Sequence, residues 1–156
     1  MSVFIGTFEN KVDRKGRVSV PAPFRQILAT SAFQGMIAFR YNTPKAMEAC
    51  SLEFMERLDQ GVSDFNLFSD EHDDLAFSIF ADSHQLPFDG EGRVIVPAPL
   101  IEITGIDARA AFVGKGQTFQ IWEPEALQRR KAEARIRTRD QKLTLRLRRD
   151  DGGGSQ

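Results

Sequence analysis

The chain has 156 residues, a formal net charge of −1, 41% hydrophobic residues and 28% charged residues, which is typical of a soluble globular protein and not of a disordered one. This length allows one domain of ordinary size or two very small ones. No apolar run is long enough to span a membrane, and the first residues lack the basic and apolar regions of a signal peptide. The single cysteine, Cys50, excludes an internal disulfide, so we expect a cytoplasmic protein.

Charge is distributed unevenly along the chain. Residues 1–128 contain 11 basic and 18 acidic side chains, whereas residues 129–156 contain 10 basic and 4 acidic side chains. An acidic body with a basic tail does not suit a protein that coats nucleic acid indiscriminately. Any contact with nucleic acid must therefore come from a local positive patch.

One sequence motif occurs twice, 76 positions apart. Residues 13–23 and residues 89–99 both read Asp-x-x-Gly-Arg-Val-x-Val-Pro-Ala-Pro. A pattern of this length in a small chain indicates an internal duplication. We predict the same strands and helices around each of the two copies.

The first copy predicts a hairpin. Residues 4–12 alternate loosely between apolar and polar residues, and the Asp-x-x-Gly segment that follows is typical of a tight turn. Residues 17–20 should return as the second strand, with the two valines of the motif on one face and Arg17 and Ser19 on the other.

The prolines of the motif should end this strand and start a short helix over residues 23–29. Two further strands are expected over residues 36–41 and 47–52.

The second copy predicts the same elements in the same order. Its helix should end at Gly105, and residues 110–113 and 118–122 should form a hairpin. Neither copy is large enough to bury a good core alone, so we expect both to contribute to one sheet system.

The segment between the copies predicts helices. The first helix is expected over residues 52–58, directly after the first copy. Ser69 is expected to cap the second helix, whose first turn is rich in acidic residues. The buried side of this second helix should consist of Leu75, Phe77, Ile79 and Phe80.

The tail predicts a third helix from residue 123 to about residue 137. Alternation of leucine with polar residues from Lys142 onward suggests a strand, and residues 150–156 should fray. The arginines of the helix are interpreted either as a solvated face, which we favour, or as a source of sequence-independent attraction to DNA. They are Arg129, Arg130, Arg135, Arg137 and Arg139.

No set of residues suits catalysis or metal binding. His72 and His84 are the only histidines, so a zinc site has too few ligands. No serine has a neighbouring base, and no Gly-x-Ser-x-Gly elbow is present. We therefore expect no enzyme, no metal, no cofactor and no small-molecule substrate, and a buried apolar role for Cys50.

The first copy of the turn carries a cluster of positive charge. Three cations, Arg14, Lys15 and Arg17, lie within four residues of an exposed loop. One interpretation is a solvated hairpin with an ion pair between Asp13 and Arg17, worth about 0–1 kcal/mol. This interpretation explains Arg14 and Lys15 poorly, because hairpin geometry requires neither. The other is that these side chains contact phosphates and, through a bidentate arginine, guanine edges in the major groove of DNA.

The second copy serves as an internal control. It has Gly90 and Glu91 where the first copy has arginine and lysine, whereas the Asp-x-x-Gly-Arg frame is shared. Shared positions indicate architecture, and positions found only in the first copy indicate DNA contact. Structural turn roles are assigned to Asp13, Gly16, Asp89, Gly92 and Arg93. DNA-binding roles are assigned to Arg14, Lys15, Arg17 and Ser19.

The doubled motif resembles the MraZ family of bacterial transcriptional regulators. The resemblance also rests on Phe24-Arg25 and residues 113–122, and it covers roughly residues 3–130. It implies a structure that is mainly β with short helices (α+β), namely a pseudo-twofold duplicated AbrB/MraZ-like split β-barrel with a helical connector and a C-terminal helix. The arginine implicated in DNA binding in that family falls on Arg17.

The resemblance further implies a nucleoid-associated protein that forms a ring-shaped homo-oligomer. Its partner is double-stranded DNA, at short direct repeats upstream of the division and cell-wall gene cluster. The chain would then divide into a first AbrB/SpoVT-type repeat, a helical connector, a second such repeat, and a basic C-terminal helix with a disordered end. These segments are 7–54, 55–82, 83–126 and 127–156.

A second hypothesis comes from another class of function. An antitoxin-like protein-interaction module uses the same half-barrel, with a basic tail or terminal helix that holds a second protein. Loss of a partner on truncation of the tail, with DNA binding unchanged, would favour this alternative.

Overall fold

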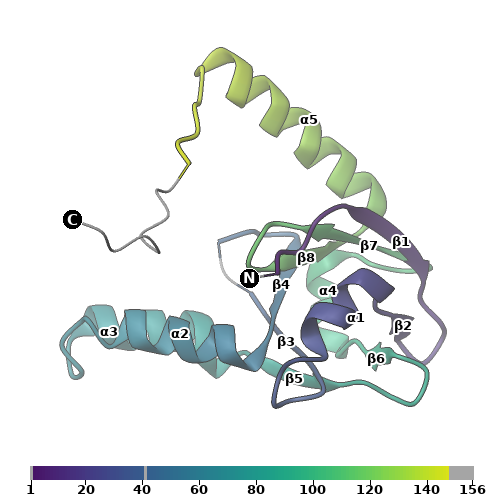
Figure 1. Ribbon diagram of the computed structural model, residues 1–156, viewed down its shortest axis with the longest axis horizontal. Helices are drawn as coiled ribbons and strands as arrows, with labels where there is room; N and C mark the ends of the chain where they lie inside the picture. The colour runs from purple at the N-terminus through teal and green to yellow at the C-terminus, as the bar shows by residue number, and fades with distance from the viewer. Residues whose placement is uncertain (1, 41, 148–156) are drawn as a thin grey trace, which may run out of the picture.

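The computed structural model describes residues 2–40 and 42–147. It contains a six-stranded antiparallel sheet in the order β1-β7-β8-β4-β3-β5 and a two-stranded sheet of β2 and β6. Figure 1 shows a body built from these sheets with α1 and α4, an arm formed by α2 and α3, and a long α5 that leaves the body. The predicted α+β class is confirmed.

Both copies of the motif form the same series of elements, as predicted. In the first copy these are β1 (Thr7–Lys11), β2 (Arg17–Ser19), α1 (Ala22–Leu28), β3 (Gly35–Phe39) and β4 (Ala46–Cys50). In the second copy they are β5 (His84–Pro87), β6 (Arg93–Ile95), α4 (Ala98–Thr104), β7 (Arg109–Gly114) and β8 (Phe119–Trp122). Tyr41, the last residue of one predicted strand, lies outside the described residues.

The short helices are present as predicted, and α1 begins and ends one residue before the predicted bounds of 23 and 29. Each has a proline in its first turn, where the ring sets φ and no backbone hydrogen bond is lost. The α4 helix ends at Gly105 with φ of +69°, a left-handed conformation that glycine adopts without strain. Phe24 of α1 and Leu100 of α4, which occupy equivalent positions of the two copies, are both buried in the core.

The strand order of the large sheet is symmetric with respect to the duplication. Exchange of the equivalent strands (β1 with β5, β3 with β7, β4 with β8) reproduces the same order read from the opposite edge. The predicted shared sheet is therefore present. The predicted hairpin of β7 with β8 is also formed, and β3 pairs with β4 in the same way.

The hairpin predicted across each charged turn is wrong. β1 pairs with β7, and β2 pairs with β6, so both partners come from the other copy. Within the first copy only a single bridge joins Val12 to Val18. The exchange of partners buries Val18 and Val94 completely at the centre of a shared core. A two-stranded hairpin within one copy has too little apolar surface to do this.

The core of the body is rich in aromatic side chains. The ring of Phe24 lies 5.2 Å from that of Phe4 and 4.9 Å from that of Phe119, measured between centroids. All three side chains are buried together with the apolar faces of α1, α4 and both sheets. The two turns are thus carried by one rigid unit.

The arm contains α2 (Leu52–Val62), α3 (Asp70–Ala76) and a π-helical turn, η1 (Phe77–Ala81). Ser51 and Ser69 cap the two helices, and the cap at Ser69 was predicted. Ile79 is buried as expected, but Phe77 is 69% exposed, so its predicted burial is wrong. Residues two apart on a helix do not share a face, so Phe77 and Ile79 cannot both face the core.

The α5 helix (Pro124–Asp140) packs on the body chiefly through its first turn, and Lys131 Nζ donates a further hydrogen bond to Thr7 Oγ1 of β1 at 2.6 Å. Ala126 and Leu127 are buried against Trp122, and the remaining turns are largely exposed. The predicted strand after Lys142 is wrong for residues 143–147, which form no strand because no strand of the described chain lies beside them. The predicted frayed end, residues 150–156, lies outside the described residues. Over residues 2–40 and 42–147, every helix is too short or too polar to cross a membrane.

Candidate nucleic-acid interface

The two charged turns are linked by the ribbon of β2 and β6. In its register Arg17 lies opposite Ile95, Val18 opposite Val94, and Ser19 opposite Arg93. The two valines point into the core. Because side chains alternate along a strand, the other four point outward together. The outer face of this ribbon therefore combines residues from both copies of the motif.

The first turn is organised by the carboxylate of Asp13. Its Oδ1 accepts hydrogen bonds from the backbone amides of Lys15 and Arg17, both at 2.9 Å, and its Oδ2 accepts one from Arg17 Nε at 2.6 Å. Gly16 closes the turn with φ of +80°. The Arg17 amide contributes most to lowering the pKa of the Asp13 carboxyl below its ordinary value. The ion pair considered for this turn is thus present.

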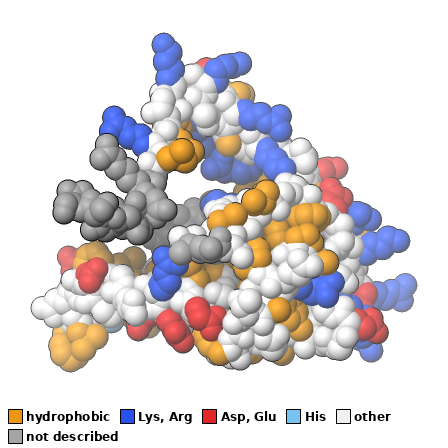
Figure 2. All heavy atoms as spheres, in the orientation of Figure 1, with side chains coloured by type: hydrophobic (Ala, Val, Ile, Leu, Met, Phe, Trp, Pro, Cys, Tyr) orange, Lys and Arg blue, Asp and Glu red, His pale blue; other side chains and the backbone are white. Residues whose placement is uncertain are grey.

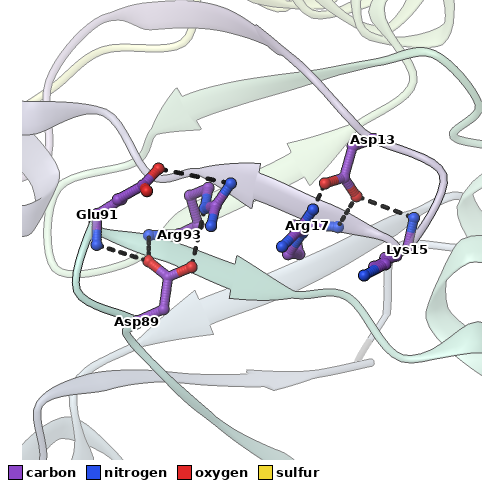
Figure 3. Close-up of polar contacts among 6 residues, drawn as sticks. All are labelled: Asp13, Lys15, Arg17, Asp89, Glu91 and Arg93. Carbon is purple, nitrogen blue, oxygen red and sulfur yellow. Dashed lines mark hydrogen bonds and ion pairs between the residues drawn. The ribbon is translucent and has the colours of Figure 1, made fainter.

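The second turn repeats this arrangement (Figure 3). Asp89 Oδ1 accepts from the backbone amides of Glu91 and Arg93 at 2.8 and 2.9 Å, and Oδ2 accepts from Arg93 Nε at 2.8 Å. Gly92 has φ of +75°. The pKa of Asp89 is lowered, chiefly by the hydrogen bond from the Arg93 amide. All five residues assigned structural roles therefore lie in these two turns.

The turns differ in charge. The first carries Arg14, Lys15 and Arg17 against one carboxylate, whereas the second carries Arg93 against two. In the second turn, Glu91 lies 3.5 Å from Arg93 Nη1. Arg14 and Lys15 are exposed, and over residues 2–40 and 42–147 neither makes an ion pair. The residues of the first turn thus carry a net positive charge and those of the second a net negative one, although Arg25 of α1 adds a positive charge against the second turn.

Arg17 combines the two roles considered for it. Its Nε is held by Asp13, which fixes the direction of the guanidinium group, and its side chain is 33% exposed. In the described part of the chain, no hydrogen bond or ion pair engages its Nη atoms. A guanidinium group held at one nitrogen and open at the others can still make a bidentate contact.

Ser19 lies at the other end of the ribbon from the first turn. It is exposed, opposite Arg93, and its carbonyl oxygen accepts a hydrogen bond from Asn10 Nδ2 at 2.7 Å. Arg17 and Ser19 therefore share the outer face of the ribbon, but Ser19 is adjacent to the second turn and not to the first, where Arg14 and Lys15 are exposed.

Arg25 is a residue of this region that sequence reasoning missed. Its Nε donates a hydrogen bond to the carbonyl oxygen of Val20 at 2.9 Å. Its side chain covers Gly92 so closely that a Cβ atom there would lie 2.7 Å from Arg25 Nη1. Arg25 thus holds the second turn against α1. The equivalent position of the second copy is Ile101, and this exchange of arginine for isoleucine was the available signal.

The basic side chains of α5 form a second positive region. The five arginines are exposed, and the only ion pairs they make among described residues are of Arg137 with Glu133 at 3.8 Å and of Arg139 with Asp140 at 3.3 Å. Figure 2 shows blue side chains along α5 and at the right-hand end of the body, and red and orange ones along the arm. The five arginines thus form a solvated face of α5.

Other reactive groups do not form a site. Over residues 2–40 and 42–147, no three side chains of His, Cys, Asp or Glu are placed to hold a metal ion. Cys50 is fully buried, as predicted, and burial raises the pKa of its thiol to about 12, so it is an inert structural thiol.

Comparison with known proteins identifies the family. A family model described as "MraZ protein, putative antitoxin-like" matches residues 79–148. A protein of Rickettsia bellii is 42% identical over 147 residues, which is 94% of this chain and 98% of that one. Proteins of Gluconacetobacter diazotrophicus and Rickettsia akari are 43% and 40% identical, over 97% and 94% of this chain and 98% of each relative.

All three relatives carry the name "Transcriptional regulator MraZ". This name describes a regulator and no enzyme, in agreement with the expectation from the sequence. The chain belongs to the MraZ family of transcriptional regulators.

Proposed function

We propose that this chain binds double-stranded DNA sequence-specifically, at short direct repeats upstream of the division and cell-wall gene cluster. The observation that carries the proposal is the first turn, where Arg14 and Lys15 are exposed and make no ion pair with any described residue, beside the held Arg17. A regulator of transcription needs a surface for DNA, and the second turn lacks such a surface because its charge is reversed.

Each residue of this surface has a distinct part in the proposed complex. Arg14 and Lys15 bind phosphates and set the position of the ribbon. The Nη atoms of Arg17 contact a guanine edge, since the major groove admits a two-stranded ribbon. Asp13 orients Arg17 before DNA arrives, so less freedom is lost on binding.

The same proposal includes the finer description of the fold. We assign a duplicated, pseudo-twofold split β-barrel, with repeats at 7–54 and 83–126, a connector at 55–82 and a tail from 127. The symmetric strand order and the central pairing of β2 with β6 support this assignment.

A ring-shaped homo-oligomer completes the proposal, in the cytoplasm and on the nucleoid. A single ribbon buries little surface on DNA. Several ribbons tethered in one ring bind a series of short DNA repeats far more tightly than a single repeat. Support comes from the opposite charges of the acidic arm and the basic α5. Both also expose apolar side chains, such as Phe68 on the arm and Ile136 on the helix. A head-to-tail contact between two such unlike surfaces closes into a ring when the rotation allows.

The test compares wild-type protein with Arg17→Ala on DNA from upstream of its own gene. A bidentate arginine contact is worth about 1–3 kcal/mol at each site, and repeated boxes multiply its loss. We expect footprinting to show protected repeats with the wild type and none with the variant. Size-exclusion profiles of both should be the same, because Arg17 lies far from the arm and α5. Tight binding by Arg17→Ala would refute the assignment.

The antitoxin-like alternative is favoured by two observations. The description of the family model contains the term "antitoxin-like", and most of α5 is exposed to solvent. Removal of residues 129–156, which takes away the exposed turns of α5 and the basic tail and leaves Ala126 and Leu127 in place, separates the two hypotheses when tested by pull-down and gel shift. A partner lost with DNA binding retained would favour the alternative.

A further inference from the structure

Ile95 has an unusual position for an exposed isoleucine. It is 60% exposed and lies on the outer face of the ribbon, directly opposite Arg17. Single exposed apolar residues are common and need no explanation. This one, however, lies at the centre of the surface proposed to meet DNA, and the equivalent position of the first copy is the polar Ser19.

The exchange of strand partners brings Ile95 to the first turn. The amide of Val96 donates a hydrogen bond to the carbonyl oxygen of Gly16 at 2.9 Å, which ties the end of β6 to that turn. Ile95 Cγ2 lies 3.9 Å from the point that a Cβ atom on Gly16 would occupy. Ile95 thus belongs in space to the positive turn, although it belongs in sequence to the second copy.

The side chain is also held firmly. It is β-branched, which restricts χ1, and the paired ribbon fixes its backbone. Directly opposite side chains of an antiparallel pair have Cβ atoms about 4.5–5.5 Å apart. Successive base pairs are about 3.4 Å apart, so Arg17 and Ile95 can meet bases of neighbouring pairs.

We propose that Ile95 contacts the methyl group of a thymine next to the base read by Arg17, and thereby helps to determine the operator sequence. The C5-methyl of thymine is the apolar group that the bases present in the major groove, and apolar side chains recognise it. A charged or polar residue would gain nothing there. The proposal rests on the proposed DNA-binding function and adds a base that the arginine does not read.

The experiment removes the methyl group from the DNA and the side chain from the protein in turn. Full-length protein is titrated by fluorescence anisotropy against the footprinted repeats, with thymines replaced one position at a time by deoxyuridine, which pairs identically and lacks the methyl. The protein variants are Ile95→Ala, Ile95→Val, and Ile5→Ala as the matched control, because Ile5 is 71% exposed elsewhere on the body.

We expect one thymine in each box at which deoxyuridine weakens wild-type binding about four-fold, the effect of burying one methyl group. Ile95→Ala should bind the two DNAs equally, whereas Ile95→Val and Ile5→Ala should keep the difference. Because Ile95 is exposed, we expect the circular dichroism melting curves of its variants to match that of the wild type.

Two outcomes would overturn the inference in distinguishable ways. Equal deoxyuridine effects in wild type and Ile95→Ala, with binding still lost in Arg17→Ala, would reject the methyl contact and leave the DNA-binding function intact. No binding by the wild type would reject the proposed function and the inference with it, whereas unchanged binding by Arg17→Ala would reject the assigned DNA-binding surface on which the inference rests. If Ile95→Ala folds poorly, Ile95→Ser, which carries the residue found at the equivalent position of the first copy, takes its place, and a retained deoxyuridine effect in this variant would reject the methyl contact.

Discussion

The turns at Asp13 and Asp89 are held by the same three hydrogen bonds to one carboxylate and by a glycine with positive φ. They differ at the two positions between the aspartate and the glycine, which are arginine and lysine in the first turn and glycine and glutamate in the second. A duplicated frame thus keeps its internal contacts while its outward residues diverge. The residues that both turns share stabilise the turn itself, whereas the residues that differ indicate what each turn binds.

The largest expected effect comes from exchanging the unshared residues. Arg14→Gly with Lys15→Glu converts the first turn into the second and should weaken operator binding more than ten-fold at low salt. The slope of log K against log salt should fall by about 2 for each bound subunit, because two phosphate contacts are lost. Gel shifts at several salt concentrations provide both values.

The matched control transfers the removed charges to the second turn with Gly90→Arg and Glu91→Lys. The quadruple variant keeps the net charge of −1, and a Cβ atom at position 90 would meet no atom within 4 Å. Weak operator binding by this variant would show that location matters and not total charge. Full recovery would mean that the two turns are interchangeable.

A smaller effect is expected from the shared glycines. Gly16→Ala and Gly92→Ala each force a left-handed backbone on a residue with a Cβ atom, which costs about 1–2 kcal/mol. The Cβ atom would also lie 3.1 Å from the carbonyl oxygen of Val96 at Gly16, and within 3 Å of Arg25 at Gly92. Urea denaturation should show both losses of stability, whereas Gly90→Ala should match the wild type. An unchanged midpoint for Gly16→Ala would contradict a structural role for the frame.

The smallest effect concerns pH. Both aspartates have a pKa below the ordinary value of 3.8 in the folded chain. Their stabilising contribution is therefore present above the unfolded pKa and is lost as the pH falls through the folded one. Below about pH 4, the melting temperature of the wild type should fall more steeply than that of a double variant with Asp13→Asn and Asp89→Asn. Parallel curves from circular dichroism melts would show that the two carboxylates contribute nothing measurable.

Much of the local structure was predictable from the sequence. The repeated motif predicts the order of the elements in each copy, because turn residues, prolines and helix caps act through bonds to their own neighbours. Asp13 and Asp89 are examples, since each bonds to backbone within four residues. The errors at Phe77 and after Lys142 arose where a pattern was extended without regard to helical geometry or to a partner strand.

The two turns, the short helices, the buried valines and the contrast in charge could all be read from the residue order, because each of them depends on neighbouring residues. The pairing of β1 with β7 and of β2 with β6 could be found only in the folded molecule. A two-residue period identifies a strand and its buried face but not its neighbour, and the pairing here followed from the need to bury Val18 and Val94 in one core. That pairing placed Ile95 beside Arg17 and joined both copies of the motif in one surface.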